Sequence, residues 1–219
     1  MASHVIDHLT LALQGRTMQI QLRVVAVALS IAFGSVTAAC FDRSSTDAQE
    51  ASATLDTFKR MPDGKEWTTA NLNVDTDGSY CYEDAELNCR RYGRLYTWDA
   101  AQRACQSLRG GWRLPTNHEW QQLARHHGGL MEESDEGGKA TYAALLTGGS
   151  AGFNALLGGS RVSGDQSYAR LEAHGLYWTA SESGATTAWF YNFGKGGQSL
   201  NRHRAGNKQM AISVRCVRE

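Results

Sequence analysis

The middle of the chain contains a stretch with the hydrophobic spacing of an amphipathic helix. Its apolar side chains recur at intervals of three and four residues and so share one helical face: Ala101, Ala104, Cys105 and Leu108. Thr97 stands at the expected N-cap, and Asp99 follows in the first turn, where a negative charge is favourable. Gly110 begins a glycine pair that is typical of a helix end. The pattern predicts a helix between Thr97 and Gly110.

A second helix is predicted shortly afterwards. Trp112 and Leu114 are typical of a short buried strand that leads into it. Thr116 and Glu119 have the spacing of a capping box, in which each side chain bonds the other residue's backbone N–H. The expected inner face consists of Trp120, Leu123, Ala124 and His127. The glycine pair at 128–129 is expected to end this helix.

Beyond these helices the pattern changes to short strands and long loops. Glycine pairs recur, and short apolar runs lie between them: YAALL (142–146), FNALL (153–157), LYWTA (176–180), AWFYNF (188–193) and AISVRCV (211–217). Such runs, bounded by turn residues, favour strands. Two helices followed by a loop-rich antiparallel sheet predict an α+β fold.

The N-terminal region has the order of a bacterial secretion signal. Arg23 precedes an apolar run at 24–39, which is short for a membrane span. Small residues then lead to Cys40, in a pattern that resembles a lipobox. We therefore expect residues 1–39 to be a signal peptide and Cys40 to be lipidated, with plain secretion or a buried helix as alternatives. Because the residues before Met18 lack a basic cluster, Met18 is a candidate start.

Composition adds a tether and excludes one class of partner. Residues 41–57 are small and polar and cannot bury a core, so 40–59 is expected to be a lipidated, flexible tether. The folded domain is then expected over 60–219. The 22 Lys and Arg balance 22 Asp and Glu, which gives no electrostatic case for nucleic acid. We expect an exported lipoprotein, anchored by its lipid at the outer membrane or cell surface.

Four cysteines remain after Cys40: Cys81, Cys89, Cys105 and Cys216. An even number in an exported domain favours disulfides, and four cysteines allow three pairings. Cys81 and Cys89 flank the polar segment YEDAELN, a natural local loop, which leaves Cys105 to pair with Cys216. Four free thiols are the alternative. A zinc site is disfavoured because no Cys-x-x-Cys spacing occurs.

Several blocks occur in an order that resembles a known family. They are DGKEWTTANLN (63–73), GSYCYEDAELNCRRYGRLYTWDAAQRAC (78–105), GWRLPTNHEW (111–120), FNALLGGSR (153–161), GLYWTASE (175–182) and NKQMAISVRCVRE (207–219). Together they resemble the Fibrobacter succinogenes major paralogous domain, an exported bacterial module related to C-type-lectin-like and formylglycine-generating-enzyme-like folds. The resemblance implies a C-type-lectin-like fold and export. It implies little about the ligand.

We expect no catalytic residues. The block WRLPTNHEW is also similar to a block of formylglycine-generating enzymes, which oxidise a sulfatase cysteine. Those enzymes use two cysteines near the C-terminal end of the domain, whereas this chain has only Cys216 there. Four residues of the block are therefore expected to stabilise the fold: Arg113, Leu114, Pro115 and Trp120. An oxidase of this type remains the enzymatic alternative.

No metal or cofactor is expected either. Calcium-dependent lectins carry a Glu-Pro-Asn or Gln-Pro-Asp loop, but Pro62 and Pro115 lie outside any such motif. His126 and His127 are neighbours that point to different helix faces. The stretch around His118 lacks the His-Glu-x-x-His spacing that would place two imidazoles together.

The candidate binding residues lie near the C-terminal end. Along AWFYNF, alternation places Trp189, Tyr191 and Phe193 on one face. Phe193 and Leu200 are expected to fill the core, and six residues to project outward: Phe190, Asn192, Gln198, Asn201, His203 and Arg204. Aromatic, amide and arginine side chains over a glycine-rich loop are typical of a paratope, which predicts a protein or glycan ligand of unknown identity. An ordinary exposed edge and loop is the alternative.

A further resemblance concerns diversity-generating retroelements, which write mutated codons into the C-terminal end of C-type-lectin-like proteins. Some of their targets are surface lipoproteins, and the variable segment ends just before the last core strand. This resemblance implies that residues 178–217 are diversified. A self-assembling structural protein of the envelope is the remaining alternative.

Overall fold

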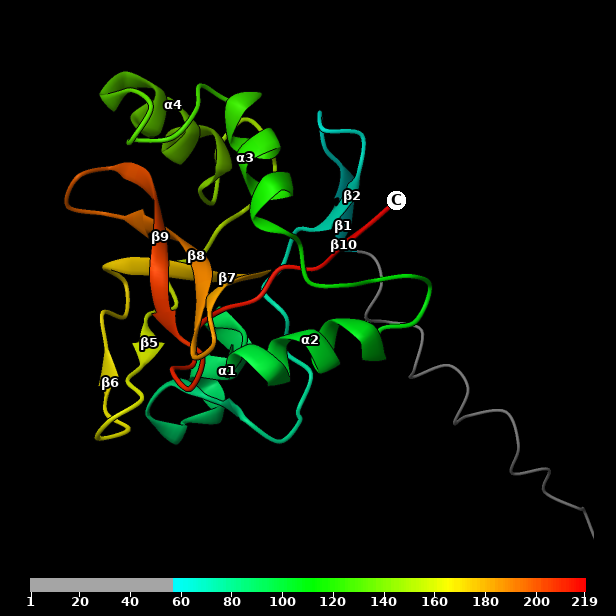
Figure 1. Cartoon of the computed structure of the whole chain (residues 1–219), viewed down its shortest axis with the longest axis vertical. Coiled ribbons are helices and arrows are strands. Elements are labelled where there is room, and N and C mark those ends of the chain that lie inside the picture. The colour runs from blue at the N-terminus through cyan, green and yellow to red at the C-terminus, as the bar shows by residue number, and fades with distance from the viewer. Residues whose placement is uncertain (1–56) are drawn as a thin grey trace, which may run out of the picture. The chain divides into compact units, whose positions relative to one another are not determined.

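The computed structural model describes residues 57–219, and Figure 1 shows how their elements follow one another. The expected signal peptide, Cys40 and most of the tether lie outside the described residues. Four α-helices and several small antiparallel sheets make up the described part, which confirms the α+β class.

The helical elements are, in chain order, a 3-10 helix (Tyr82–Asp84), α1 (Glu86–Tyr92), α2 (Trp98–Ser107), α3 (Asn117–Arg125) and α4 (Asp135–Leu145). The strands are β1 (Phe58–Arg60), β2 (Glu66–Thr68), β3 (Ser79–Tyr80), β4 (Leu95–Tyr96), β5 (Ser160–Arg161), β6 (Tyr168–Ala169), β7 (His174–Gly184), β8 (Thr187–Gly194), β9 (Ser199–Asn207) and β10 (Val217–Arg218).

Helices α2 and α3 form where the hydrophobic spacing predicts them. Thr97 has the extended backbone of an N-cap before α2, but its hydroxyl makes no capping hydrogen bond. Before α3 the capping box is complete: the Thr116 hydroxyl accepts the Glu119 N–H at 3.2 Å, and the Glu119 carboxylate accepts the Thr116 N–H at 2.8 Å. Sequence spacing therefore predicted both helices, and the full cap of one.

Four of the five residues of YAALL (142–146) are helical, and Leu146 is the C-cap, so the expectation of a strand there is wrong. The run lies in the C-terminal part of α4, whose Ser134 cap accepts a hydrogen bond from the Gly137 N–H at 3.2 Å. One of the recurring glycine pairs that suggested turns, at 137–138, lies inside this helix. A Cβ at Gly137 would collide with the carbonyl oxygen of Gly128, which shows that glycine allows α4 to pack closely on the end of α3.

Strands β7, β8 and β9 form an antiparallel sheet with β8 in the middle. The expected strands LYWTA and AWFYNF lie inside β7 and β8. Strand β9 was not predicted, because its sequence SLNRHRAGN is polar and much of it is exposed. The expected strand FNALL is reduced to one bridge, between Ala155 and Leu146.

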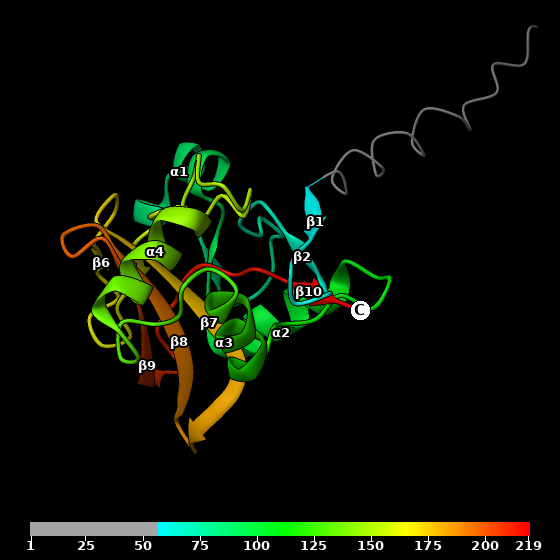
Figure 2. The same cartoon turned by 90° about the horizontal axis from the view of Figure 1, so that it is seen from above.

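The C-terminal segment crosses the domain and returns to its first strands. Ile212 bridges Tyr96, and farther along β10 pairs with β2, with Val217 opposite Trp67. Figures 1 and 2 show this red segment running to the cyan strands β1 and β2. The run AISVRCV is therefore extended, but only its last residue belongs to a named strand.

The β7–β8–β9 sheet separates two clusters of buried side chains. Helices α3 and α4 contribute to one cluster, and α2 contributes to the other, as their positions on either side of the sheet in Figure 1 indicate. In the first cluster the Trp120 ring stacks on Tyr191 at 5.0 Å and meets Trp67 and Phe153 edge to face at 5.2 and 5.6 Å. The WRLPTNHEW block thus supplies the centre of an aromatic core.

A fully buried arginine joins three distant segments. The Arg215 guanidinium donates to four oxygens: Asn71 Oδ1 at 2.9 Å, Thr68 O at 2.9 Å, Phe153 O at 2.7 Å and Asn154 O at 2.6 Å. Among the described residues it has no carboxylate within ion-pair distance. Burial lowers the pKa of Arg215, since neutral acceptors compensate only part of the lost hydration. These hydrogen bonds tie the C-terminal segment to the stretch at 68–71 and to the loop at 153–154.

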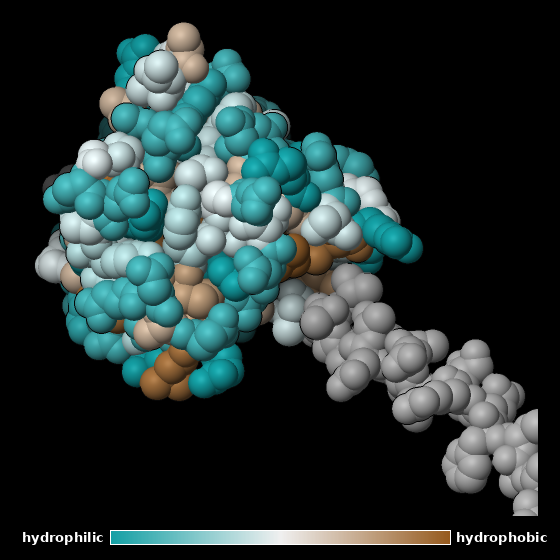
Figure 3. Space-filling model, turned by 90° about the horizontal axis from the view of Figure 1, so that it is seen from below, coloured by the Kyte–Doolittle hydropathy of each residue, from teal (hydrophilic) through white to brown (hydrophobic). Residues whose placement is uncertain are grey.

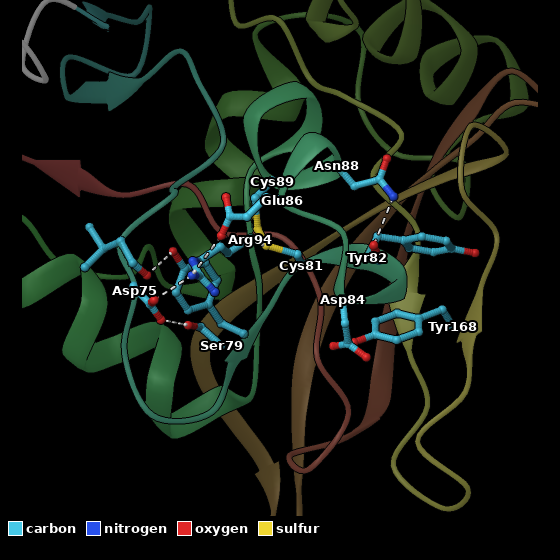
Figure 4. The surroundings of a disulfide bond; sticks show 12 residues. Asp75, Ser79, Cys81, Tyr82, Asp84, Glu86, Asn88, Cys89, Arg94 and Tyr168 are labelled. Atoms are coloured by element: carbon cyan, nitrogen blue, oxygen red, sulfur yellow. Dashed lines mark hydrogen bonds and ion pairs between the residues drawn. A yellow bond between two sulfur atoms is a disulfide. The ribbon is translucent and has the colours of Figure 1, made fainter. Parts of the chain in front are cut away.

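Both predicted disulfides are present, Cys81–Cys89 and Cys105–Cys216. The longer one joins α2 to the C-terminal segment. The shorter one encloses the 3-10 helix and the start of α1, where a loop had been expected. Figure 4 shows its surroundings, in which Arg94 pairs with Asp75 at 2.7 Å.

The carboxylate of Glu119 is buried beside a bidentate arginine. Arg113 donates to its two oxygens at 2.9 and 2.7 Å. Burial acts to raise the pKa of Glu119, but the hydrogen bonds from Arg113 and Thr116 outweigh it and lower the pKa to about 2. Because this pKa lies below the unfolded value, ionised Glu119 stabilises the fold above about pH 5, and the contribution is lost as pH falls toward 2.

We therefore expect Glu119→Gln to lower the free energy of unfolding by about 2 kcal/mol near pH 7. The difference from the parent chain should shrink steadily in acid. Urea unfolding of both chains across the acidic range measures it. The control is Glu136→Gln, since the Glu136 side chain is 89% exposed. A Glu119→Gln deficit that stays constant down to low pH would contradict this interpretation.

Candidate functional site

The β8–β9 ladder brings four of the six predicted binding residues onto one face of the sheet. Phe190 lies opposite His203, and Asn192 lies opposite Asn201. Residues that are directly opposed in an antiparallel pair present their side chains to the same face. We call these four residues the recognition surface. Figure 1 shows the two orange strands that carry it.

An aromatic pair forms one half of the recognition surface. The ring centroids of Phe190 and His203 are 4.9 Å apart, with an angle of 20° between the planes. Although His203 is exposed on one side, packing removes enough water to lower its pKa, and the nearby positive charge of Arg170 acts in the same direction. At neutral pH the imidazole is therefore uncharged and presents a flat, polarisable face.

Two amides form the other half. The Asn192 Oδ1 is 2.9 Å from the Nδ1 of His174, and the Asn201 Nδ2 donates to the Ser199 hydroxyl at 3.0 Å. These bonds orient both amides. Within residues 57–219 the other amide atoms, Asn192 Nδ2 and Asn201 Oδ1, have no hydrogen-bond partner. The pair thus presents one donor and one acceptor to a ligand.

The surface rests on a firmly packed layer. Phe190 meets the ring of Trp178 edge to face at 6.1 Å, and the Trp178 indole N–H donates to the backbone carbonyl oxygen of Tyr96 at 2.8 Å. A Cβ at Gly206 would collide with both Phe190 and Trp178, so glycine is required for this close approach. Rigid support of this kind reduces the ordering cost of binding.

The remaining two predicted residues lie elsewhere, so the six do not form one continuous surface. Gln198 is in the turn between β8 and β9, with a positive φ of 47°. Arg204 follows His203 on the opposite side of the strand, and its guanidinium lies 5.9 Å from the Trp189 ring centre. A bulge between Ala188 and Phe190 shifts the register at this point.

His174 was missed by sequence reasoning. It reaches Asn192 because the start of β7 runs beside the end of β8. Its local sequence contains no signal for this contact, since the contact depends on the register of the β7–β8 hairpin, whose strands are joined by a short turn at 185–186. A hydrogen-bonding partner of this kind becomes visible only when the strands are aligned.

A comparison with protein families finds one that matches most of the chain. The Fibrobacter succinogenes major domain (Fib_succ_major) matches residues 53–218. The chain belongs to this family. No curated protein matches the chain, and no solved structure matches it. Membership of the Fib_succ_major family confirms the resemblance found in the sequence blocks, and it carries no assignment of ligand.

We next consider whether the Fib_succ_major domain contains a metal site or a reactive cysteine. Over residues 57–219, no group of three or more His, Cys, Asp or Glu side chains is arranged to hold a metal ion. His118 and His126 are exposed, while His127 is half-buried, and burial lowers its pKa. Cys216 is committed to its disulfide.

The exposed surface contains few large apolar side chains. Those exposed within the described residues are Phe58, Leu87 and Val162. The face shown in Figure 3 is mainly hydrophilic, with small separate hydrophobic spots. Polar recognition by directed groups fits this character better than broad hydrophobic association does.

Proposed function

We propose that the chain is a surface-exposed bacterial lipoprotein whose Fib_succ_major domain binds a protein or glycan ligand without catalysing a reaction. The observation that carries the proposal is the recognition surface itself. A flat aromatic pair and two oriented amides lie side by side on the β8–β9 ladder, with His203 exposed and the other three side chains half-buried. Such groups combine apolar contact with directed hydrogen bonds, as rigid binding surfaces do.

The proposed fold is C-type-lectin-like. Three features support it: the disulfide from α2 to the C-terminal segment, the pairing of β10 with β2, and the loop-rich stretch between the helices and the β7–β8–β9 sheet. In such a domain the scaffold holds the ends together, and the exposed strands and loops are left free to vary. The Cys216 disulfide also supports a binding role, because an oxidase of the formylglycine-generating type would need reactive cysteines in this region.

The proposed location is the outer membrane or cell surface, through lipid on Cys40. The two disulfides support export, since such bonds persist in oxidising compartments. No helix among residues 57–219 is long and apolar enough to span a membrane. Mass spectrometry of the mature N-terminus tests the anchor: a diacylglyceryl group on Cys40 is expected, and an intact N-terminus with residues 2–17 would contradict both processing and a start at Met18.

The proposal extends to diversification of the ligand-binding segment by a retroelement. The Asn192, Asn201 and His203 side chains are half-buried or exposed and so tolerate replacement better than the buried core residues Tyr191, Phe193 and Leu200. The gene neighbourhood tests this directly. A reverse-transcriptase gene and a near-copy of the codons for residues 178–217 are expected, and the absence of both would remove this part of the proposal.

Binding can be tested with an array of glycans and displayed peptides as probes. We expect the combined variant Asn192→Ala, Asn201→Ala, His203→Ala to lose at least about tenfold in affinity for any array ligand that the parent chain binds. Its melting temperature should stay within about 3 °C of the parent, because these side chains are partly or fully exposed. Binding is measured by calorimetry on the purified full chain.

The matched control is Lys139→Ala, an exposed change on α4 that should alter neither property. An array ligand bound equally well by the combined variant would place binding elsewhere. Concentration-dependent growth of large assemblies in light scattering, with no array binding, would favour a self-assembling envelope protein instead.

A further inference from the structure

A hollow lies between α1, the end of α4 and the β8–β9 turn. It shares no residue with the recognition surface. Its volume is about 300 Å³. The floor is aliphatic and consists of Leu146, Ala155, Leu156 and Leu157. Charges of both signs stand on the rim: Arg91, Glu172 and Lys195. An apolar floor with a few convergent polar groups is the usual composition of a small-ligand site.

The floor is held rigidly from below. The buried Tyr177 hydroxyl accepts the Leu156 N–H at 2.8 Å and donates to the Leu156 carbonyl at 2.8 Å. Thr147 bonds the Ala155 oxygen through its N–H at 3.1 Å and its hydroxyl at 2.9 Å. Arg215 fixes the two residues that precede this stretch. The aliphatic floor is thus preformed and needs no ordering when a ligand binds.

The rim contains unused polar capacity. Glu172 has a positive φ of 57°, and its Oε1 is paired with Arg91 at 3.1 Å and accepts a hydrogen bond from the Tyr92 hydroxyl. Within the described part of the chain, Glu172 Oε2 has no hydrogen-bond or ion-pair partner, and neither has Lys195 Nζ. Glu172 and Lys195 both line the hollow, so its rim carries one carboxylate oxygen and one ammonium group without a hydrogen-bond partner among the described residues.

We infer that this hollow binds an apolar α-amino acid in its zwitterionic form. The ammonium group bonds Glu172 Oε2, the carboxylate pairs with Lys195, and the aliphatic side chain lies on the leucines of the floor. Both signs of charge on the rim select a ligand that carries both, and the floor rejects a polar side chain, which would lose its hydration there. The volume is near the lower limit of small-ligand pockets, about 300 Å³, which suits a single amino acid.

The expected affinity is modest. The Glu172 and Arg91 side chains are 56% and 68% exposed, so solvent weakens each charge contact. We therefore expect a dissociation constant on the order of 1 mM. Affinity in this range is measurable by magnetic-resonance titration of backbone amides.

The test titrates the isotope-labelled full chain with L-leucine. Saturable shifts are expected at the amides of Leu156, Leu157 and Lys195. Hexanoate and hexylamine, which each carry only one of the two charges, should bind at least about tenfold more weakly. Lys195→Ala and Glu172→Gln should each weaken L-leucine binding at least about fivefold, and a thermal melt of each variant checks that the fold is intact.

Matched controls are Lys139→Ala and Glu136→Gln, which change an exposed charge pair on α4 and should leave leucine binding unchanged. Absence of saturable shifts in the parent chain would overturn the inference. Hexanoate that binds as tightly as leucine, with Glu172→Gln unaffected, would reduce the hollow to a site for anionic amphiphiles and would also overturn it. Neither result bears on the recognition surface, whose test uses different variants and probes.

Discussion

Arg215→Met should lower the free energy of unfolding by about 3–5 kcal/mol, the largest loss expected for a single substitution in this domain. The substitution fills a similar volume but removes the donor from three backbone carbonyl oxygens, those of Thr68, Phe153 and Asn154. It leaves Asn71 Oδ1 with the Tyr177 hydroxyl as its one donor among the described residues. A buried acceptor that loses its partner bears the full cost of its lost hydration. The loop at 153–154 and the segment at 68–71 would then lose their common attachment.

Urea unfolding measures this loss. Arg215→Lys should recover little of it, because an ammonium group cannot reach four oxygens in the fixed geometry of a guanidinium. The matched control is Arg125→Met, whose side chain is 57% exposed and should cost less than about 1 kcal/mol. If the Arg215→Met chain were as stable as the control variant, the guanidinium hydrogen bonds would make no net contribution to the free energy of unfolding.

Removal of the long disulfide, through Cys105→Ala with Cys216→Ala, should cost about 4–5 kcal/mol. The bond closes a loop of 111 residues, so it greatly restricts the unfolded chain. Both sulfur atoms are also buried in the cluster beneath α2. We expect this double variant to unfold at a much lower denaturant concentration than the parent chain.

The short disulfide provides the comparison. Its loop spans 8 residues, and the same treatment gives about 2–3 kcal/mol for Cys81→Ala with Cys89→Ala. Denaturant unfolding of the two double variants side by side tests the ranking. A short-disulfide variant that loses more stability than the long-disulfide variant would mean that local structure around α1, rather than chain restriction, dominates.

The parts of the fold that could be predicted are those with a local physical signal. The helix from Trp98 was visible because its apolar residues repeat with a helical period, and α3 because Thr116 and Glu119 form a capping box. The α4 helix was missed because Gly137 resembles a turn, whereas its function is to admit a neighbouring backbone. Close packing between distant segments leaves no mark in the local pattern.

The candidate site shows the same division. Alternation along β8 correctly placed Phe190 and Asn192 on the face opposite Phe193. The polar strand β9 gave no hydrophobic signal, so neither the strand nor the alternation that places Arg204 on the side opposite His203 was predicted. The buried Arg215 was likewise invisible, because nothing in the sequence around a charged residue indicates that distant carbonyl groups will surround it.

The central claim is that ligand binding takes place on the recognition surface. The most direct measurement maps backbone-amide shifts of the isotope-labelled chain on addition of an array-identified ligand. We predict that the largest shifts occur at Phe190, Asn192, Asn201 and His203 and are lost in the combined variant. Shifts concentrated on α1 and the end of α4, with the recognition surface unchanged, would contradict the claim.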